Sequence, residues 1–143
     1  MNIDGVMITP LKKIFNEKGN IYHCLKNSDP GFIGFGEAYF SSVTCGAIKG
    51  WNRHKNMTLN LIVAVGEVSF VICEHKKEHK SKSKFFQISL SESNYHRLTI
   101  PPGLWVAFQG KGRNLNLILN IADSCHDTNE LEKVGLDIFP YKF

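Results

Sequence analysis

The sequence lacks long hydrophobic runs, and even the stretch from Leu61 to Val65 is far too short to cross a bilayer. It also lacks a basic N-terminal start followed by an apolar stretch, which argues against a secretory signal. The four cysteines include no Cys-x-x-Cys motif and no closely spaced pair, so free thiols are expected rather than disulfides or zinc ligands. We therefore expect a cytoplasmic protein without a membrane partner.

Helical patterns are scarce as well. A single segment, DTNELEKVG at residues 127–135, carries both a start signal and a stop signal. Asp127 or Thr128 would cap its first turn, and Gly135 would end it. The sequence therefore predicts one short C-terminal helix in an otherwise non-helical chain.

The composition is that of one folded domain, which we expect to span residues 1–143. Hydrophobic residues make up 43% and charged residues 21%, both typical of a globular protein. Much of the net charge of +4 lies in EHKKEHKSKSK, residues 74–84. No aromatic residues alternate with these lysines, so we expect a solvated loop and no nucleic-acid partner. A mild positive field would also suit a small molecule that carries a diphosphate.

Most of the remaining sequence reads as short strands separated by turn residues. Residues 59–65 and 68–73 flank Gly66, which is typical of a tight hairpin. In SKFFQISLS, residues 83–91, apolar and polar side chains alternate. Pro101 lacks a backbone donor and so marks a turn between two further strands. Many short strands at regular spacing predict an all-β sandwich or barrel.

The order of five motifs resembles the cupin fold and, within it, the dTDP-4-dehydrorhamnose 3,5-epimerase family. The match runs from about Met7 to Tyr141 and rests on GEAYFSSVTCGAIKGW, VAVGEVSFVI, LTIPPGLWVAFQG, NIADSCHDTNE and LDIFPY. The resemblance implies an all-β cupin jelly roll, a homodimer, and a pocket for a nucleotide-diphosphate 4-keto-6-deoxy sugar. The implied reaction removes a proton beside the keto group and returns it on the other face, without a redox cofactor.

The family's reactive residues are replaced at the matching positions, which points to a divergent side branch. Its Arg-Gly-Leu-His motif reads KGWN here, so Lys49 replaces the arginine and Asn52 the histidine base. An amide cannot take a proton at neutral pH. The enolate-stabilising lysine matches Asn60, the second-motif histidine Val106, and the tyrosine acid Leu119. The resemblance places the family's orienting aspartate beyond the last residue of this sequence.

The metal ligands of cupins are largely replaced too. The His-x-His pair reads Asn52-Arg53-His54, and the third histidine is again Val106. A metal centre of this type needs three or four converging nitrogen and oxygen ligands. We therefore predict no catalytic metal.

Strand alternation suggests a substitute base. Asn52 and His54 are two residues apart, so their side chains point the same way: if Asn52 faces the barrel interior, His54 does too, while Arg53 points away. His54 then becomes the candidate base, and the alternative is a histidine at the barrel rim. Glu37 and Tyr39 alternate on the preceding strand and are candidates for a carboxylate and a phenol in the same cavity. The alternative for them is an ordinary half-buried strand.

Five polar residues are candidates for binding substrate. Lys49, Asn52 and Asn60 match the family's site positions, and Lys111 and Arg113 would suit a pyrophosphate at the pocket mouth. The alternative for Lys111 and Arg113 is a surface turn.

Two functions remain open. The first is a sugar-nucleotide epimerase or isomerase in surface-polysaccharide or deoxysugar biosynthesis, with Asn52 in place of the usual histidine. The second is a non-catalytic cupin that binds a nucleotide sugar or a partner enzyme.

Overall fold

The computed structural model describes residues 2–76 and 82–143, which form twelve strands and, within these ranges, no helix. The strands are β1 (Met7–Pro10), β2 (Lys13–Ile14), β3 (Ile21–Tyr22), β4 (Glu37–Ser42), β5 (Ile48–His54), β6 (Leu59–Val65), β7 (Glu67–His75), β8 (Ser83–Ser91), β9 (His96–Ile100), β10 (Trp105–Gly110), β11 (Leu117–Ala122) and β12 (Leu131–Lys133). Part of the predicted basic loop, residues 77–81, lies outside the described residues.

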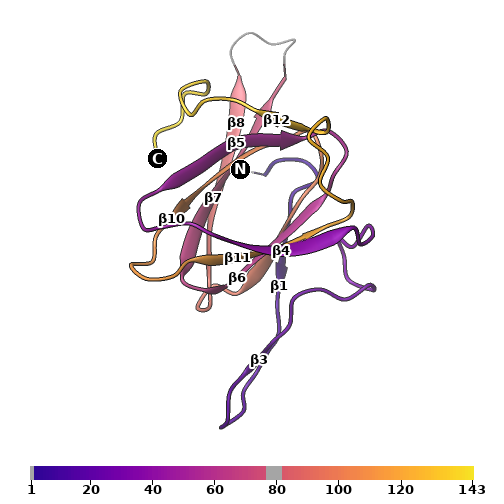
Figure 1. The fold of residues 1–143 in the computed structure, drawn as a ribbon, viewed down its shortest axis with the longest axis vertical. Coiled ribbons are helices and arrows are strands. Elements are labelled where there is room, and N and C mark those ends of the chain that lie inside the picture. Colours follow the sequence, from indigo (N-terminus) through magenta and orange to yellow (C-terminus); the bar gives the residue numbers. More distant parts are fainter. Residues whose placement is uncertain (1, 77–81) are drawn as a thin grey trace.

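Ten strands form two five-stranded antiparallel sheets that face each other. Sheet I has the strand order β1-β9-β6-β11-β4, and sheet II has the order β12-β5-β10-β7-β8. The remaining pair, β2 and β3, forms an arm that projects from the body (Figure 1). Inward residues of both sheets, such as Leu61, Phe70 and Ile118, form the main core. This arrangement confirms the predicted all-β cupin jelly roll.

The turn at Gly66 differs from the predicted hairpin. β6 pairs with β9 and β11, whereas β7 pairs with β8 and β10, so the chain crosses from sheet I to sheet II at this glycine. Gly66 has φ +79°, and a Cβ atom there would collide with the carbonyl oxygen of Leu115. The buried Asn116 side chain holds this corner, because it accepts from the amides of Glu67 (2.9 Å) and Gly112 (3.0 Å).

The predicted C-terminal helix is wrong. Asn129 N–H donates to Asp127 Oδ1 (2.9 Å) and Glu130 N–H donates to the Asp127 carbonyl (3.1 Å), so the expected cap residue closes a turn instead. Residues 131–133 then extend as β12 along β5. A nine-residue helix is marginal on its own, and pairing at the edge of sheet II outweighs its local preference.

The last residues of the chain cover the outer face of sheet II. Trp51 on β5 is fully buried there, with its ring centroid 5.3 Å from Phe139 and 5.7 Å from Phe143. Tyr141 joins this aromatic cluster and donates its hydroxyl to Gln87 (2.8 Å). Trp51 therefore packs on the side of sheet II that faces away from sheet I.

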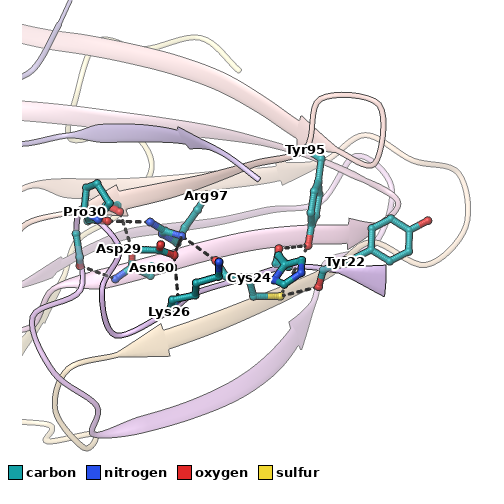
Figure 2. Close-up of polar contacts among 11 residues, drawn as sticks. Tyr22, Cys24, Lys26, Asp29, Pro30, Asn60, Tyr95 and Arg97 are labelled. Atoms are coloured by element: carbon teal, nitrogen blue, oxygen red, sulfur yellow. Dashed lines mark hydrogen bonds and ion pairs between the residues drawn. The ribbon is translucent and has the colours of Figure 1, made fainter. Parts of the chain in front are cut away.

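A buried arginine anchors the segment 23–31 on the outer face of sheet I. Arg97 on β9 is fully buried and donates to the carbonyl oxygens of Cys24 (2.8 Å) and Pro30 (2.8 Å), as Figure 2 shows. It also pairs with Asp29, with Nη1 and Oδ2 3.2 Å apart. These contacts use outward-facing groups of sheet I, so this face carries a structural anchor.

Residues 2–76 and 82–143 contain no helix with the length and apolar character that crossing a membrane requires.

Candidate active site

A cavity of about 210 Å³ lies between the two sheets. Its floor is apolar and includes Leu59, Leu61 and Phe70. Six polar side chains complete the lining, namely Tyr39, Ser41, Lys49, Asn52, His54 and Asn120. Tyr39 and Lys49 are exposed while also lining the cavity, so they mark its mouth. As strand alternation predicts, Asn52 and His54 share this cavity.

A bulge in β5 brings Lys49 into the same cavity. Val106 of β10 pairs with Asn52, but Phe108, two residues further along, pairs with Lys49, so β5 contains one extra residue. Without this extra residue, Lys49 would face away from Asn52. Gly50 makes the bulge possible, because its φ is +134° and a Cβ atom there would lie 2.6 Å from Ala107 Cα.

His54 is held by a carboxylate that sequence analysis did not identify. Its Nδ1 lies 2.7 Å from Oε2 of Glu130, the residue before β12. The other carboxylate oxygen accepts from the amides of Asn56 and Met57, both at 2.8 Å. With Nδ1 bonded to Glu130, the Nε2 atom of His54 is the ring nitrogen left for other partners.

Glu130 is buried and ionised. Burial raises the pKa of this carboxyl, but the hydrogen bonds from His54 and from the Asn56 and Met57 amides outweigh it and hold the pKa below its usual 4.5. A buried carboxylate at this position orients the imidazole and favours a proton on Nδ1. The pair has the geometry of a histidine general base with its orienting acid.

A second carboxylate, that of Glu132 on β12, contacts β5 on the side of sheet II that faces away from the cavity. Glu132 Oε2 accepts from Arg53 Nε at 2.5 Å, and the Arg53 guanidinium stacks 4.5 Å from the Trp105 ring centroid. Arg53 thus points away from His54, as predicted. Successive residues of β5 are therefore each tied to an acidic residue at or next to β12, one on each side of sheet II.

Tyr39 lies opposite Asn120 in the pairing of β4 with β11. Asn120 Nδ2 donates to the Tyr39 hydroxyl oxygen at 2.8 Å. Burial raises the pKa of Tyr39 most, the Asn120 hydrogen bond lowers it, and the nearby charge of Glu37 adds to the rise. The net result is a phenol that keeps its proton at neutral pH, as an acid must before it donates.

Four of the predicted site residues do not line the cavity. Glu37 lies at the start of β4 and acts on Tyr39 only through its charge. Asn60 faces outward between Leu59 and Leu61, and its amide donates to the Gly31 carbonyl at 3.0 Å and accepts from Thr99 at 2.6 Å (Figure 2).

The other two, Lys111 and Arg113, are exposed on the turn after β10. That turn follows the Gly110 end of β10, whereas His54 lies near the Trp105 end. Lys111 and Arg113 therefore lie on a surface turn, which was the alternative to a role in binding pyrophosphate.

The described residues hold no cluster of three or more histidine, cysteine, aspartate or glutamate side chains that would bind a metal ion. Within the cavity itself, His54 is accompanied by the amides of Asn52 and Asn120 and by the Lys49 amine. Amides and an amine on these strands bind polar organic groups in preference to transition metals.

Sequence analysis missed two residues of the site. Glu130 lies within the segment predicted as a helix, and nothing local to it indicates a partner on β5. Asn120 was missed because the family resemblance placed the acid at Leu119. The alternation in LNLILN, with Ile118 and Asn120 on one face, is the signal that would have found it.

No protein-family model and no curated protein matches the sequence, but solved structures do. A dTDP sugar isomerase from Desulfovibrio desulfuricans G20 is 31% identical, with a TM-score of 0.91 over 98% of this chain and 91% of that one. The dTDP-4-dehydrorhamnose 3,5-epimerase of Bacillus anthracis, with TDP and pyrophosphate bound, is 16% identical (TM-score 0.82; 99% and 87% covered). A variant of the 3,4-ketoisomerase of Thermoanaerobacterium thermosaccharolyticum, in complex with TDP-4-keto-6-deoxyglucose, is 19% identical (TM-score 0.73; 92% and 88% covered). The chain therefore belongs to the dTDP-4-dehydrorhamnose 3,5-epimerase-like family of cupins, as a divergent member.

Proposed function

We propose that this protein isomerises or epimerises a 4-keto-6-deoxyhexose carried on dTDP or a related nucleotide diphosphate, with His54 as the base. The observation that carries the proposal is the His54–Glu130 pair at 2.7 Å in a cavity enclosed by β-strands. Carbon acids beside a carbonyl lose a proton only to a well-placed base, and an oriented imidazole suits that task near neutral pH.

In the proposed mechanism, Nε2 of His54 takes the proton from the carbon next to the keto group. Negative charge moves to the keto oxygen, where the Asn52 amide is a nearby donor. Tyr39 supplies a proton as the enolate collapses, and its hydroxyl is free to donate because Asn120 already donates to its oxygen. Protons are removed and returned without electron transfer, so the reaction needs no redox cofactor.

The cavity size supports a divided binding mode. At about 210 Å³ it is smaller than the ~300–1,000 Å³ of pockets that enclose a drug-sized ligand. We therefore assign the hexose ring to the cavity and the nucleotide to its mouth. Lys49 lies at this mouth, with Nζ 2.7 Å from the Ser42 carbonyl, and its charge suits the diphosphate.

A non-catalytic sugar-nucleotide cupin is the second candidate. It is favoured by Asn52, which takes the place of the histidine that the family uses as its base. In that case His54 and Glu130 would act only in binding, or in holding β12 on the barrel.

Solvent exchange separates the two candidates. The protein is incubated with dTDP-4-keto-6-deoxyglucose in D2O, and proton NMR follows the signals at C3 and C5. Deuterium incorporation or a new isomer, lost in His54→Gln, supports catalysis. If no exchange occurs but the sugar nucleotide raises the melting temperature, binding alone is supported. If neither occurs, both candidates are excluded.

We also propose that the protein is a homodimer, as the family resemblance implies. The support is a set of exposed apolar side chains on sheet I and its neighbouring loops, including Phe40 (67% exposed), Ile33 and Phe35. Sedimentation equilibrium should give twice the chain mass of 16.2 kDa, whereas a monomer at micromolar concentration would contradict this assembly.

A further inference from the structure

Asn120 is a polar residue of the cavity to which the proposed mechanism gives only a supporting role. It lies on β11, is 7% exposed, and faces the cavity beside the apolar Ile118. Its Nδ2 end is used, because it donates to the Tyr39 hydroxyl oxygen at 2.8 Å. The amide nitrogen of Asn120 therefore has a hydrogen-bond partner within the protein.

The other half has no partner. Oδ1 of Asn120 is inaccessible to bulk solvent, and no donor among the described residues reaches it. An amide oxygen accepts up to two hydrogen bonds, and buried acceptors in folded proteins are nearly always satisfied. The Asn120 side chain lines the cavity, so a donor group of a molecule bound in the cavity is the natural partner for this oxygen.

We infer that Asn120 Oδ1 accepts a hydrogen bond from a hydroxyl group of the bound sugar and thereby selects sugars that carry this hydroxyl. The inference rests on the proposed function and deepens it, since it assigns a specificity residue to the same cavity. A hydroxyl group can donate to Oδ1, whereas a carbonyl oxygen or a deoxygenated carbon cannot.

The same side chain also links recognition of the sugar hydroxyl to the position of Tyr39, the proposed acid. Asn120 bonds Tyr39 through one end of a planar amide and the sugar hydroxyl through the other. A correctly placed hydroxyl therefore fixes the amide plane that holds the phenol. A sugar without the hydroxyl leaves a buried acceptor unpaired, and sites of this kind discriminate strongly against the analogue.

Calorimetry with four ligands tests the inference. They are dTDP-4-keto-6-deoxyglucose, its 2-deoxy and 3-deoxy analogues, and dTDP alone. The wild-type protein should bind the parent sugar roughly 10–100-fold more tightly than one of the analogues. In Asn120→Leu this preference should disappear while the affinity for dTDP is unchanged. The control Ile118→Val, on the same strand and face, should keep the preference.

Two results would overturn the inference. One is equal wild-type affinity for the parent and both analogues, a measurement that needs no variant to fold. The other is an Asn120→Leu protein that retains the full preference. A protein that shows the preference but no exchange in D2O keeps this inference and loses the catalytic proposal, whereas one that binds none of the sugars loses both.

Discussion

His54 and Glu130 are 76 positions apart in the sequence, yet His54 Nδ1 and Glu130 Oε2 are 2.7 Å apart in the fold. β12 makes this contact by pairing with β5, where Leu131 lies opposite His54. The residue that completes the site thus comes from the segment whose secondary structure was predicted wrongly.

Glu130→Gln should lower the turnover number by roughly 10²-fold or more. The glutamine has one acceptor oxygen, so it cannot serve both His54 and the amides of Asn56 and Met57. Proton NMR should also show loss of the protected His54 Nδ1–H signal, a readout that does not depend on activity. Glu132→Gln, which alters the outer face of β5, should leave that signal in place; equal loss in both variants would argue against a specific orienting role.

The stabilising effect of Glu130 should depend on pH. Its pKa is lowered in the folded protein, so its contribution is fully present above the unfolded value of about 4.5 and is lost as the pH falls through the folded pKa. Urea unfolding at pH 7 should therefore separate wild type from Glu130→Gln more widely than unfolding below pH 4. A difference that stays constant across this range would mean that the carboxylate charge contributes nothing.

Asn116→Ala should lower the free energy of unfolding by about 2–4 kcal/mol. Its side chain accepts from the Glu67 and Gly112 amides and donates to the Val43 carbonyl (3.1 Å), and the substitution would remove all three hydrogen bonds from a corner where Asn116 itself is buried. Asn114→Ala, two residues away and exposed, should change the unfolding free energy by less than about 0.5 kcal/mol. Similar midpoints in urea for the two variants would contradict the role of Asn116 at this corner.

Gly50→Ala should destabilise the protein by more than Gly19→Ala. Both glycines have nearly the same φ, +134° and +131°, which residues with a side chain rarely adopt, so an alanine costs about 1–3 kcal/mol of backbone strain at either position. Only at Gly50 would the new Cβ meet another strand, at 2.6 Å from Ala107, whereas nothing lies within 4 Å of Gly19. Equal thermal shifts would indicate that β5 and β10 are not in close contact at the bulge.

Much of the fold was predictable because its strands carry local signals. The alternation of apolar and polar side chains in β8 and the turn at Pro101 indicated where strands lie. The two-residue spacing of Asn52 and His54 indicated that their side chains point to the same side of the strand. The partners of those strands were not predictable in the same way. Gly66 looked like the centre of a hairpin, because a positive φ is required equally by a hairpin and by a crossing between sheets.

The candidate site was predictable only in part, because its geometry depends on pairings between distant strands. The bulge at Gly50 changes which side Lys49 faces, and it is visible only in the pairing of β5 with β10. Asn60 and Leu119 were placed by family spacing, whereas the observed register turns both away from the cavity. The role of Glu130 could be recognised only from the pairing of β12 with β5 at the edge of sheet II.

The order of His54 and Glu130 along the chain has a consequence for synthesis. During translation the ribosome releases His54 long before residue 130, so the barrel walls exist as polypeptide while the imidazole still lacks its carboxylate partner. The proposed chemistry would therefore begin only once β12 has emerged from the ribosome and docked on β5, which makes this docking the step that activates the protein.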